Sequence, residues 1–193
     1  MTLNNHHAVI DNDFLDHLST TRIRGLTDAQ HLELFKTFFD ALSIIPIVHP
    51  LVLQYEILAD KDSIRPFFEN NIVHPVSKDD ILQNDPERAL FYEVTVKDLY
   101  QKLTNELFPC EITDIWTDWI RGYSLGEVHS VVMCLLCNCT IFLSDDGDSK
   151  ELQRIIETQS LGKVEVLNRA EVISKLPDGT FNKKTRSALT HKL

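Results

Sequence analysis

Two short apolar runs, far apart in the chain, each end in a group of aspartates. The first run opens the segment 8–13, which reads AVIDND, and the second opens the segment 140–148, which reads TIFLSDDGD. A short apolar run bounded by polar residues predicts a buried strand. In an open sheet the carboxyl ends of parallel strands lie at one edge, and ligands bind in the crevice there. We therefore expect Asp11 and Asp146 to meet in one pocket, although more than half of the chain separates them.

Strand-like and helix-like segments alternate along the chain. The strand candidates are residues 8–13, 44–48, 72–73, 140–143 and 163–167. The helix candidates are residues 28–44, 51–60, 87–107, 113–121, 124–138, 149–158 and 169–176. This alternation predicts an α/β fold of three layers, α/β/α, with a central, mainly parallel sheet of about four or five strands and right-handed crossovers.

Length and composition favour one domain. With 193 residues, of which 43% are hydrophobic, the chain can bury one full core, so residues 1–193 are expected to form a single domain. The long stretch 60–122 is predicted to be a helical insertion or cap within it. Trp116 and Trp119 stand three positions apart in this stretch, a spacing that is typical of the buried face of a helix. Stacking on nucleic-acid bases is the alternative role for these two side chains.

The net charge of −10 argues against a broad nucleic-acid-binding surface. The charge is unevenly distributed, however, because the residues from 175 onward carry five basic side chains against one acidic side chain. The basic residues are Lys175, Lys183, Lys184, Arg186 and Lys192. Residues 177–193 are therefore predicted to form a basic C-terminal helix or tail, which is either solvated or holds a phosphate backbone or an acidic partner.

The sequence predicts a cytoplasmic protein with no membrane segment. No run approaches the roughly 18 apolar residues of a membrane span, and the N-terminus lacks a basic region followed by the apolar core of a secretory signal. Three of the four cysteines, Cys134, Cys137 and Cys139, lie close together without a second pair at zinc-ligand spacing. Buried thiols in a reducing compartment are the interpretation that this pattern favours.

Two further acids lie between the aspartate groups. Glu56 ends the segment VLQYE, and Glu127 directly follows Gly126. Clustered carboxylates raise one another's pKa unless a cation neutralises them, and hard oxygen ligands suit Mg²⁺ or Mn²⁺. A divalent-metal site that includes Asp11 and Asp146 is therefore expected. Each acid also has a structural alternative, because an aspartate after a strand can cap the next helix and a glutamate suits the first turn of a helix.

Together these segments resemble the PIN-domain nucleases. Residues 9–15 resemble the opening motif of that family, and residues 141–148 resemble its late strand, which ends in Thr or Ser, Asn or Asp, Asp, any residue and Asp. Glu56 and Glu127 fit positions, after the second strand and at the start of the helix before the late strand, where the family carries acids. The order of the four segments agrees, and the resemblance covers most of the chain apart from its middle stretch and its tail.

The resemblance implies a PIN-like fold and a metal-dependent nuclease, expected to be an endoribonuclease, that hydrolyses phosphodiester bonds with Mg²⁺ or Mn²⁺. The acids that it makes catalytic are Asp11, Glu56, Glu127 and Asp146. The metal ligands that it implies are Asp11, Glu127, Asp146 and Asp148, with supporting roles for Asp13, Ser144 and Asp145. RNA is the expected substrate, and DNA is the alternative. An antitoxin or another protein partner, and a homo-oligomer, are compatible with the family.

Two other functions remain open at this point. In a phosphatase resembling the haloacid-dehalogenase superfamily, Asp11 and Asp13 would be nucleophile and acid, and Asp145 and Asp146 would be metal ligands. Phe14 then stands where Thr, Val or Gly is more usual, and the two mid-chain glutamates have no role. The second alternative is a catalytically degenerate PIN-like domain that serves as a binding module.

Overall fold

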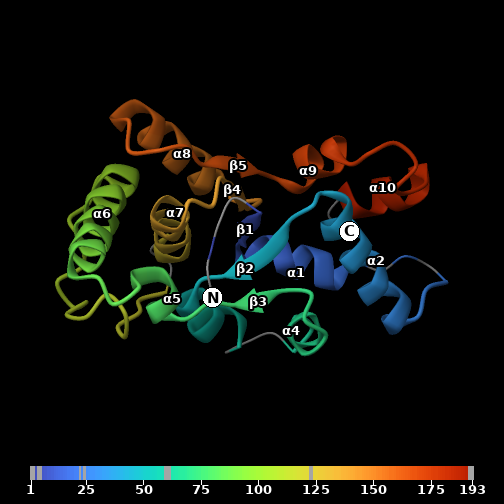
Figure 1. Ribbon diagram of the computed structural model, residues 1–193, viewed down its shortest axis with the longest axis horizontal. Helices are drawn as coiled ribbons and strands as arrows, with labels where there is room; N and C mark the ends of the chain where they lie inside the picture. The colour runs from blue at the N-terminus through green and yellow to red at the C-terminus, as the bar shows by residue number, and fades with distance from the viewer. Residues whose placement is uncertain are drawn as a thin grey trace.

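The computed structural model describes residues 3, 6–21, 23, 25–58, 62–121 and 124–190. Within these residues a sheet of five parallel strands lies in the order β3-β2-β1-β4-β5, with helices on both faces (Figure 1). The strands are β1 (His7–Ile10), β2 (Ile45–Val48), β3 (His74–Pro75), β4 (Ile141–Leu143) and β5 (Glu165–Leu167). The three-layer α/β/α fold predicted from the sequence is confirmed.

The middle strand of the sheet is β1, and its composition explains that place. All four of its residues are buried, as expected for a strand with helices on both faces. Val9 pairs with Ile47 of β2 on one side and with Phe142 of β4 on the other. The strand predicted at 8–13 ends earlier than expected, because Asp11 already caps the next helix. The candidate at 72–73 lies just before the short edge strand β3.

Successive side chains of the strands enter two separate apolar clusters, because strand side chains point alternately to opposite faces. Val9 and Phe142 belong to one cluster, and Ile10 and Leu143 belong to the other. Helices that contribute to the first cluster are α5 (Lys78–Leu82), α6 (Pro86–Thr104), α7 (Leu125–Cys137) and α8 (Gly147–Gln159). Helices that contribute to the second are α1 (Asn12–Thr20), α2 (Asp28–Ala41), α4 (Arg65–Glu69), α9 (Arg169–Lys175) and α10 (Lys183–Thr190).

The chain leaves β2 through a short α-helix, α3 (Pro50–Val52), which continues as a π-helical segment, η1 (Leu53–Ile57). The amide of Leu58 donates to the carbonyl of Leu53 at 2.8 Å, which is the five-residue spacing of a π-helix. A continuous α-helix was predicted over 51–60. The π-helical segment adds a residue to the turn that carries Glu56, and residues 59 and 60 lie outside the described part of the chain.

The stretch predicted as a helical insertion supplies both an edge strand and core residues. Helix α6 buries Tyr92, Val96 and Leu99 in the first apolar cluster and packs against α7. Residues 60, 61 and 122 at the ends of the stretch lie outside the described part of the chain.

The prediction of a helix over 113–121 is wrong, because the structure has turns there. The Asp118 carboxylate accepts the amide N–H groups of Thr113 (2.7 Å) and Asp114 (2.9 Å), and such bonds compete with helix formation. Trp116 and Trp119 are therefore not on a helix face. Trp116 instead stacks on the ring of Tyr92, with 4.3 Å between the ring centroids.

The basic C-terminal region forms a helix, α10, over Lys183–Thr190, and residues 177–182 before it are not helical. Helix α10 carries Lys183, Lys184 and Arg186, whereas Lys192 lies outside the described residues. The Arg186 guanidinium donates to the carbonyls of Ile173 and Leu176 and so satisfies the end of α9. This arginine therefore has a structural role. No helix among the described residues is both long enough and apolar enough to span a bilayer.

Candidate metal centre

Four of the predicted acids, Asp11, Glu56, Glu127 and Asp146, lie near enough to act on one another's charge, and Asp11 and Asp146 follow the neighbouring strands β1 and β4. From β1 the chain proceeds to β2 and β3 on one side, whereas β4 and β5 lie on the other side. This reversal of strand order is the point at which open α/β sheets bind ligands. The backbone N–H of Asp11 donates to the carbonyl of Leu143 at 3.0 Å, so Asp11 and Ser144 leave the two neighbouring strands together.

Asp11 is held by hydrogen bonds on both of its carboxylate oxygens. Its Oδ1 accepts the backbone N–H of Asp13 at 2.8 Å, which makes Asp11 the N-cap of α1, and its Oδ2 accepts the Ser144 hydroxyl at 2.5 Å. The Ser144 oxygen in turn accepts the Asp146 amide (3.1 Å) and the Ser149 hydroxyl (2.8 Å). Ser144 therefore orients Asp11, and Ser149, which the sequence did not single out, supports Ser144.

Glu56 approaches the first turn of α7 closely. A Cβ atom added to Gly126 would lie only 2.6 Å from Oε1 of Glu56, so the carboxylate occupies the space that a larger residue would need. Glu127 is the next residue and lies in the first turn of α7. Glycine at position 126 thus allows Glu56 to lie beside Glu127. The π-helical geometry around Glu56 is of a kind that occurs often at functional sites.

The charges of the cluster act on one another. Burial, together with the nearby carboxylates of Asp11, Glu56 and Asp146, raises the pKa of Glu127 to about 8. Burial also raises the pKa of Asp11 to about 7, against the lowering effect of its bonds to Ser144 and to the Asp13 amide. The carboxylates of Asp13 and Asp146 act on Asp11, and those of Asp11, Glu56 and Asp146 act on Glu127. Asp11, Glu56, Glu127 and Asp146 thus form one electrostatic unit.

Asp146 and Asp148 lie at the start of α8. The Asp146 carboxylate accepts the Asp148 amide at 2.7 Å and caps the helix, so Asp146, like Asp11, also fulfils the capping role. The Asp148 carboxylate accepts the Ser124 hydroxyl at 2.6 Å and thereby connects the start of α8 to the residue before α7. Asp148 and Asp13 are exposed at the rim of the site.

Asp145 points to a different set of partners. Its Oδ2 accepts the side-chain N–H of Arg169 at 2.5 Å and lies 2.8 Å from Nδ1 of His17, and its Oδ1 accepts the Arg169 backbone N–H at 3.0 Å. Burial alone would raise the pKa of Asp145, but these bonds and the Arg169 charge hold it below its usual value. Arg169 was missed by sequence reasoning, although its place two residues after β5 puts it at the same sheet edge.

A buried network connects the segments that carry the two glutamates. The Tyr92 hydroxyl lies 2.7 Å from Nε2 of His49, which caps α3, and 2.6 Å from Nδ1 of His129, which lies one turn into α7. Nδ1 of His49 accepts the Leu51 amide N–H, so the ring proton of His49 is on Nε2. The Nε2–H of His49 then donates to the Tyr92 hydroxyl oxygen, and the Tyr92 O–H donates to Nδ1 of His129. Burial lowers the pKa of both histidines. His129 therefore has a structural role.

The donor chemistry fits a hard divalent cation. Carboxylate oxygens are the ligands that Mg²⁺ and Mn²⁺ prefer. A cation would also favour the charged forms of Asp11 and Glu127, which burial and the neighbouring carboxylates disfavour. Among the described residues, no group of three or more His, Cys, Asp or Glu side chains is arranged to hold an ion. The fit therefore rests on the type and charge of the donors, not on a ligand geometry.

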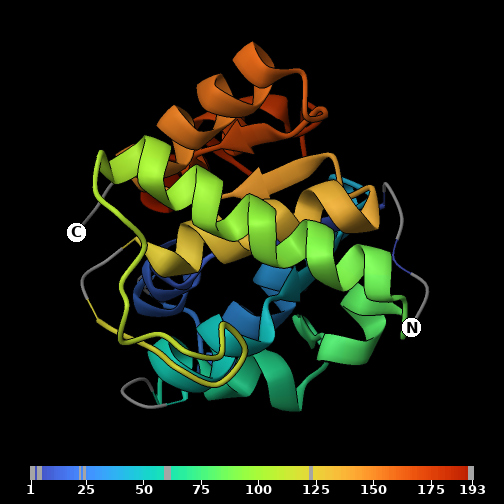
Figure 2. The same ribbon diagram turned by 90° about the vertical axis from the view of Figure 1, so that its left-hand side faces the viewer.

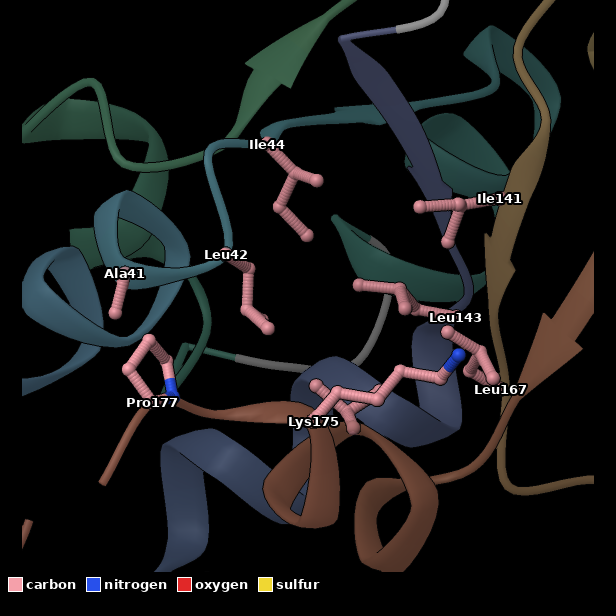
Figure 3. A pocket seen from close by; sticks show the side chains of 9 residues that line it. Ala41, Leu42, Ile44, Ile141, Leu143, Leu167, Lys175 and Pro177 are labelled. Atoms are coloured by element: carbon pink, nitrogen blue, oxygen red, sulfur yellow. The ribbon is translucent and has the colours of Figure 1, made fainter. Parts of the chain in front are cut away.

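An apolar hollow of about 250 Å³ lies elsewhere, between α2, the sheet and α9 (Figure 3). Leu42 and Ile44 face it from the α2–β2 connection, and Leu143 faces it from β4. Lys175 is the charged residue of its wall. No carboxylate lines the hollow, so it is separate from the candidate metal centre.

Comparison of the chain with protein-family models, with curated proteins and with solved structures finds no match. The resemblance to PIN-domain nucleases therefore remains a prediction, carried by the four segments of sequence and by the chemistry of their acids.

Proposed function

We propose that the protein is a metal-dependent nuclease of the PIN-like type and acts as an endoribonuclease. The observation that supports this proposal best is the pair of raised pKa values at Asp11 and Glu127, within a group of four carboxylates at the switch point of the sheet. Perturbed acids in such a position are typical of functional sites.

In this proposal Asp11, Glu56, Glu127 and Asp146 hold Mg²⁺ or Mn²⁺. When bound, the ion lowers the pKa of water and stabilises negative charge on a phosphate group. Ser144 fixes the orientation of Asp11 through its 2.5 Å hydrogen bond. Gly126 gives Glu56 its place beside α7, and the Tyr92 network fixes the spacing of the two glutamate-bearing segments.

The proposed substrate is RNA, with DNA as the alternative, and the proposed location is the cytoplasm, which suits the four free cysteines. Because the protein and a phosphate backbone are both negatively charged, the bound cation would be needed to attract the phosphate to this edge of the sheet. The haloacid-dehalogenase-like alternative is less well supported, because it requires Asp145 as a ligand and that carboxylate is engaged by Arg169 and His17. An antitoxin or other protein partner remains compatible with the proposal.

The test is Mn²⁺-dependent cleavage of a mixed pool of single-stranded RNA by the wild type and by Asp11→Asn and Asp146→Asn. Each substitution removes one negative charge with little change of shape, so we expect a loss of about a hundredfold or more in rate. Asp28→Asn, an exposed first-turn aspartate of α2, is the matched control and should retain full activity.

Other results would point to the alternatives. Rapid Mg²⁺-dependent turnover of an aryl phosphate without RNA cleavage would favour the phosphatase. Binding of RNA by a wild type that cleaves no substrate, with or without metal, would favour the degenerate module. Full activity of both Asp11→Asn and Asp146→Asn would contradict the nuclease proposal.

A further inference from the structure

The outer face of α6 exposes apolar side chains that the fold itself does not use. Leu90 is 64% exposed, Val94 is 57% exposed and Phe91 is 39% exposed. The opposite face of the same helix is buried against α7, so the exposure is not explained by fraying. Figure 2 shows α6, in yellow-green, lying across the front of the molecule. The inner face of α6 packs in the core, whereas the outer face is exposed and can contact the surface of another protein.

These side chains form one continuous patch beside a hollow. A depression of about 520 Å³ is lined by Leu90, Phe91 and Val94, together with Thr95 and with Leu161, which follows α8. Contiguous exposed apolar patches of this kind mark interaction sites, whereas single exposed apolar residues need no explanation. We define the outer face of α6 as the residues Glu87, Leu90, Phe91, Val94, Asp98 and Lys102.

The charges on this face are arranged with opposite sign at its two ends. Glu87 lies in the first turn of α6, and Lys102 lies in the last turn, where it pairs with Asp98 at 2.7 Å. The two ends are roughly 22 Å apart along the helix axis, at about 1.5 Å per residue. A purely basic partner would be repelled by Lys102, and a purely acidic partner would be repelled by Glu87. A surface with the same two charges in reverse order is complementary to both.

We propose that this face is the interface of a homodimer, in which α6 packs antiparallel against α6 of a second copy. A two-fold axis near Val94 brings Glu87 of each copy to Lys102 of the other and buries Leu90, Phe91 and Val94 between them. Such an interface is isologous, the commonest arrangement of soluble homo-oligomers. Antiparallel packing also sets the positive end of each helix dipole beside the negative end of the other.

The dimer does not depend on the proposed nuclease function. Because the inner face of α6 packs on α7, which carries Glu127, the outer face points away from the carboxylate cluster. The proposed dimer therefore does not cover the candidate metal centre of either copy. A test of assembly can therefore fail or succeed independently of any test of cleavage.

The experiment measures the mass of the purified, full-length protein by size-exclusion chromatography with light scattering over a range of concentrations. The wild type is expected at twice the chain mass of 22.2 kDa. Leu90→Asp and Val94→Asp, which place a charge in the centre of the interface, are expected at the chain mass. Leu107→Asp is the matched control, because Leu107 is an 80% exposed leucine outside this face, and it should remain dimeric. Circular dichroism confirms that each variant is folded.

A charge exchange tests the antiparallel register. Glu87→Lys alone and Lys102→Glu alone each replace two attractive pairs per dimer by two repulsive ones, so each should weaken the dimer by about tenfold or more. The double variant restores opposite charges across the axis and should recover affinity to within about threefold of the wild type. High salt should reduce the difference between the single variants and the wild type.

Two results would overturn the proposal. The first is a wild type at the chain mass at every concentration, which would leave the outer face of α6 to a different partner. The second is a dimer that Leu90→Asp and Val94→Asp do not dissociate, which would place the interface elsewhere. A dimer that loses affinity in both single charge variants but does not recover in the double variant would contradict the antiparallel register.

Discussion

Asp11 and Asp145 follow neighbouring strands at the same edge of the sheet, yet their surroundings differ in charge. Asp145 accepts hydrogen bonds from Arg169 and lies beside His17, and its pKa is held below the usual value. Asp11 receives a hydroxyl and an amide but is otherwise near carboxylates, and burial raises its pKa to about 7. One aspartate is thus neutralised within the fold, whereas the other is the one for which we propose a bound cation.

The largest difference should appear when each aspartate is replaced by asparagine. Asp145→Asn leaves Arg169, whose side chain is 7% exposed, without its counter-charge. Removing one partner of a buried ion pair costs about 3 kcal/mol or more, which corresponds to a melting temperature lower by roughly 6–12 °C. Thermal melts of the metal-free proteins at pH 8 measure this effect.

Asp11→Asn is the matched variant, and its effect should have the opposite sign. Asparagine still caps a helix, and it removes a charge that burial disfavours. We expect the metal-free protein to gain about 1 kcal/mol or more at pH 8, since each unit of raised pKa corresponds to about 1.4 kcal/mol. If both variants were destabilised equally, the contrast between the two aspartates would be wrong.

The pH dependence of stability should show the carboxylate cluster in the metal-free protein. The pKa of Asp11 rises from 3.8 to about 7 on folding and that of Glu127 from 4.5 to about 8, so the folded state binds more protons than the unfolded state between those values. Stability is therefore lost as the pH rises through this window. His49 and His129 act in the opposite direction below pH 6.5, because burial lowers their pKa.

The net fall should therefore be clearest between about pH 6.5 and pH 8, where the histidines no longer contribute, and should amount to about 2 kcal/mol. Glu127→Gln should flatten this part of the curve, and Mn²⁺ should raise the melting temperature of the wild type more at pH 8 than at pH 6. Glu171→Gln is the control, because Lys150 and the Asn168 amide hold the pKa of Glu171 low and its titration lies far below this window. A wild-type curve that does not fall above pH 6.5 would contradict the raised pKa values.

The smallest effect on stability is expected from Gly126→Ala. Alanine is a better helix former than glycine by about 1 kcal/mol, but its Cβ would lie 2.6 Å from Oε1 of Glu56 and displace that carboxylate. We expect melting temperatures within about 2 °C of the wild type, because the flexible end of Glu56 can move, together with a weaker Mn²⁺ affinity. Isothermal titration with Mn²⁺ measures the affinity, and Gly147→Ala, where the added Cβ meets no neighbour, is the control. An unchanged affinity in Gly126→Ala would remove Glu56 from the site.

The sequence predicted the parts of the fold that depend on local pattern. The apolar runs before Asp11 and Ser144 became adjacent strands, because buried parallel strands have that pattern and their carboxyl ends share an edge. The helix predicted over 113–121 failed because the side chains of Asp114 and Asp118 bind backbone amides of their own segment, a competition that hydrophobic spacing does not register.

The candidate site could be predicted only in part for a related reason. Asp11 and Asp146 were identified from their place after a strand, which is a local property. The different role of Asp145 depends on its ion pair with Arg169. Arg169 comes close to Asp145 only because β5, which precedes it, pairs with β4. The closeness of Glu56 to α7 likewise depends on a tertiary contact with Gly126, and no spacing along the chain reports it.

The central claim is that the carboxylates around Asp11 bind a divalent cation. The most direct measurement is anomalous X-ray scattering at the manganese edge from crystals of the protein grown with Mn²⁺. We expect an anomalous peak enclosed by Asp11, Glu56, Glu127 and Asp146, and no peak at Asp145, whose carboxylate is engaged by Arg169. The account would be contradicted if these carboxylates were well ordered and no anomalous peak lay between them, in a crystal where Mn²⁺ is seen bound at other positions.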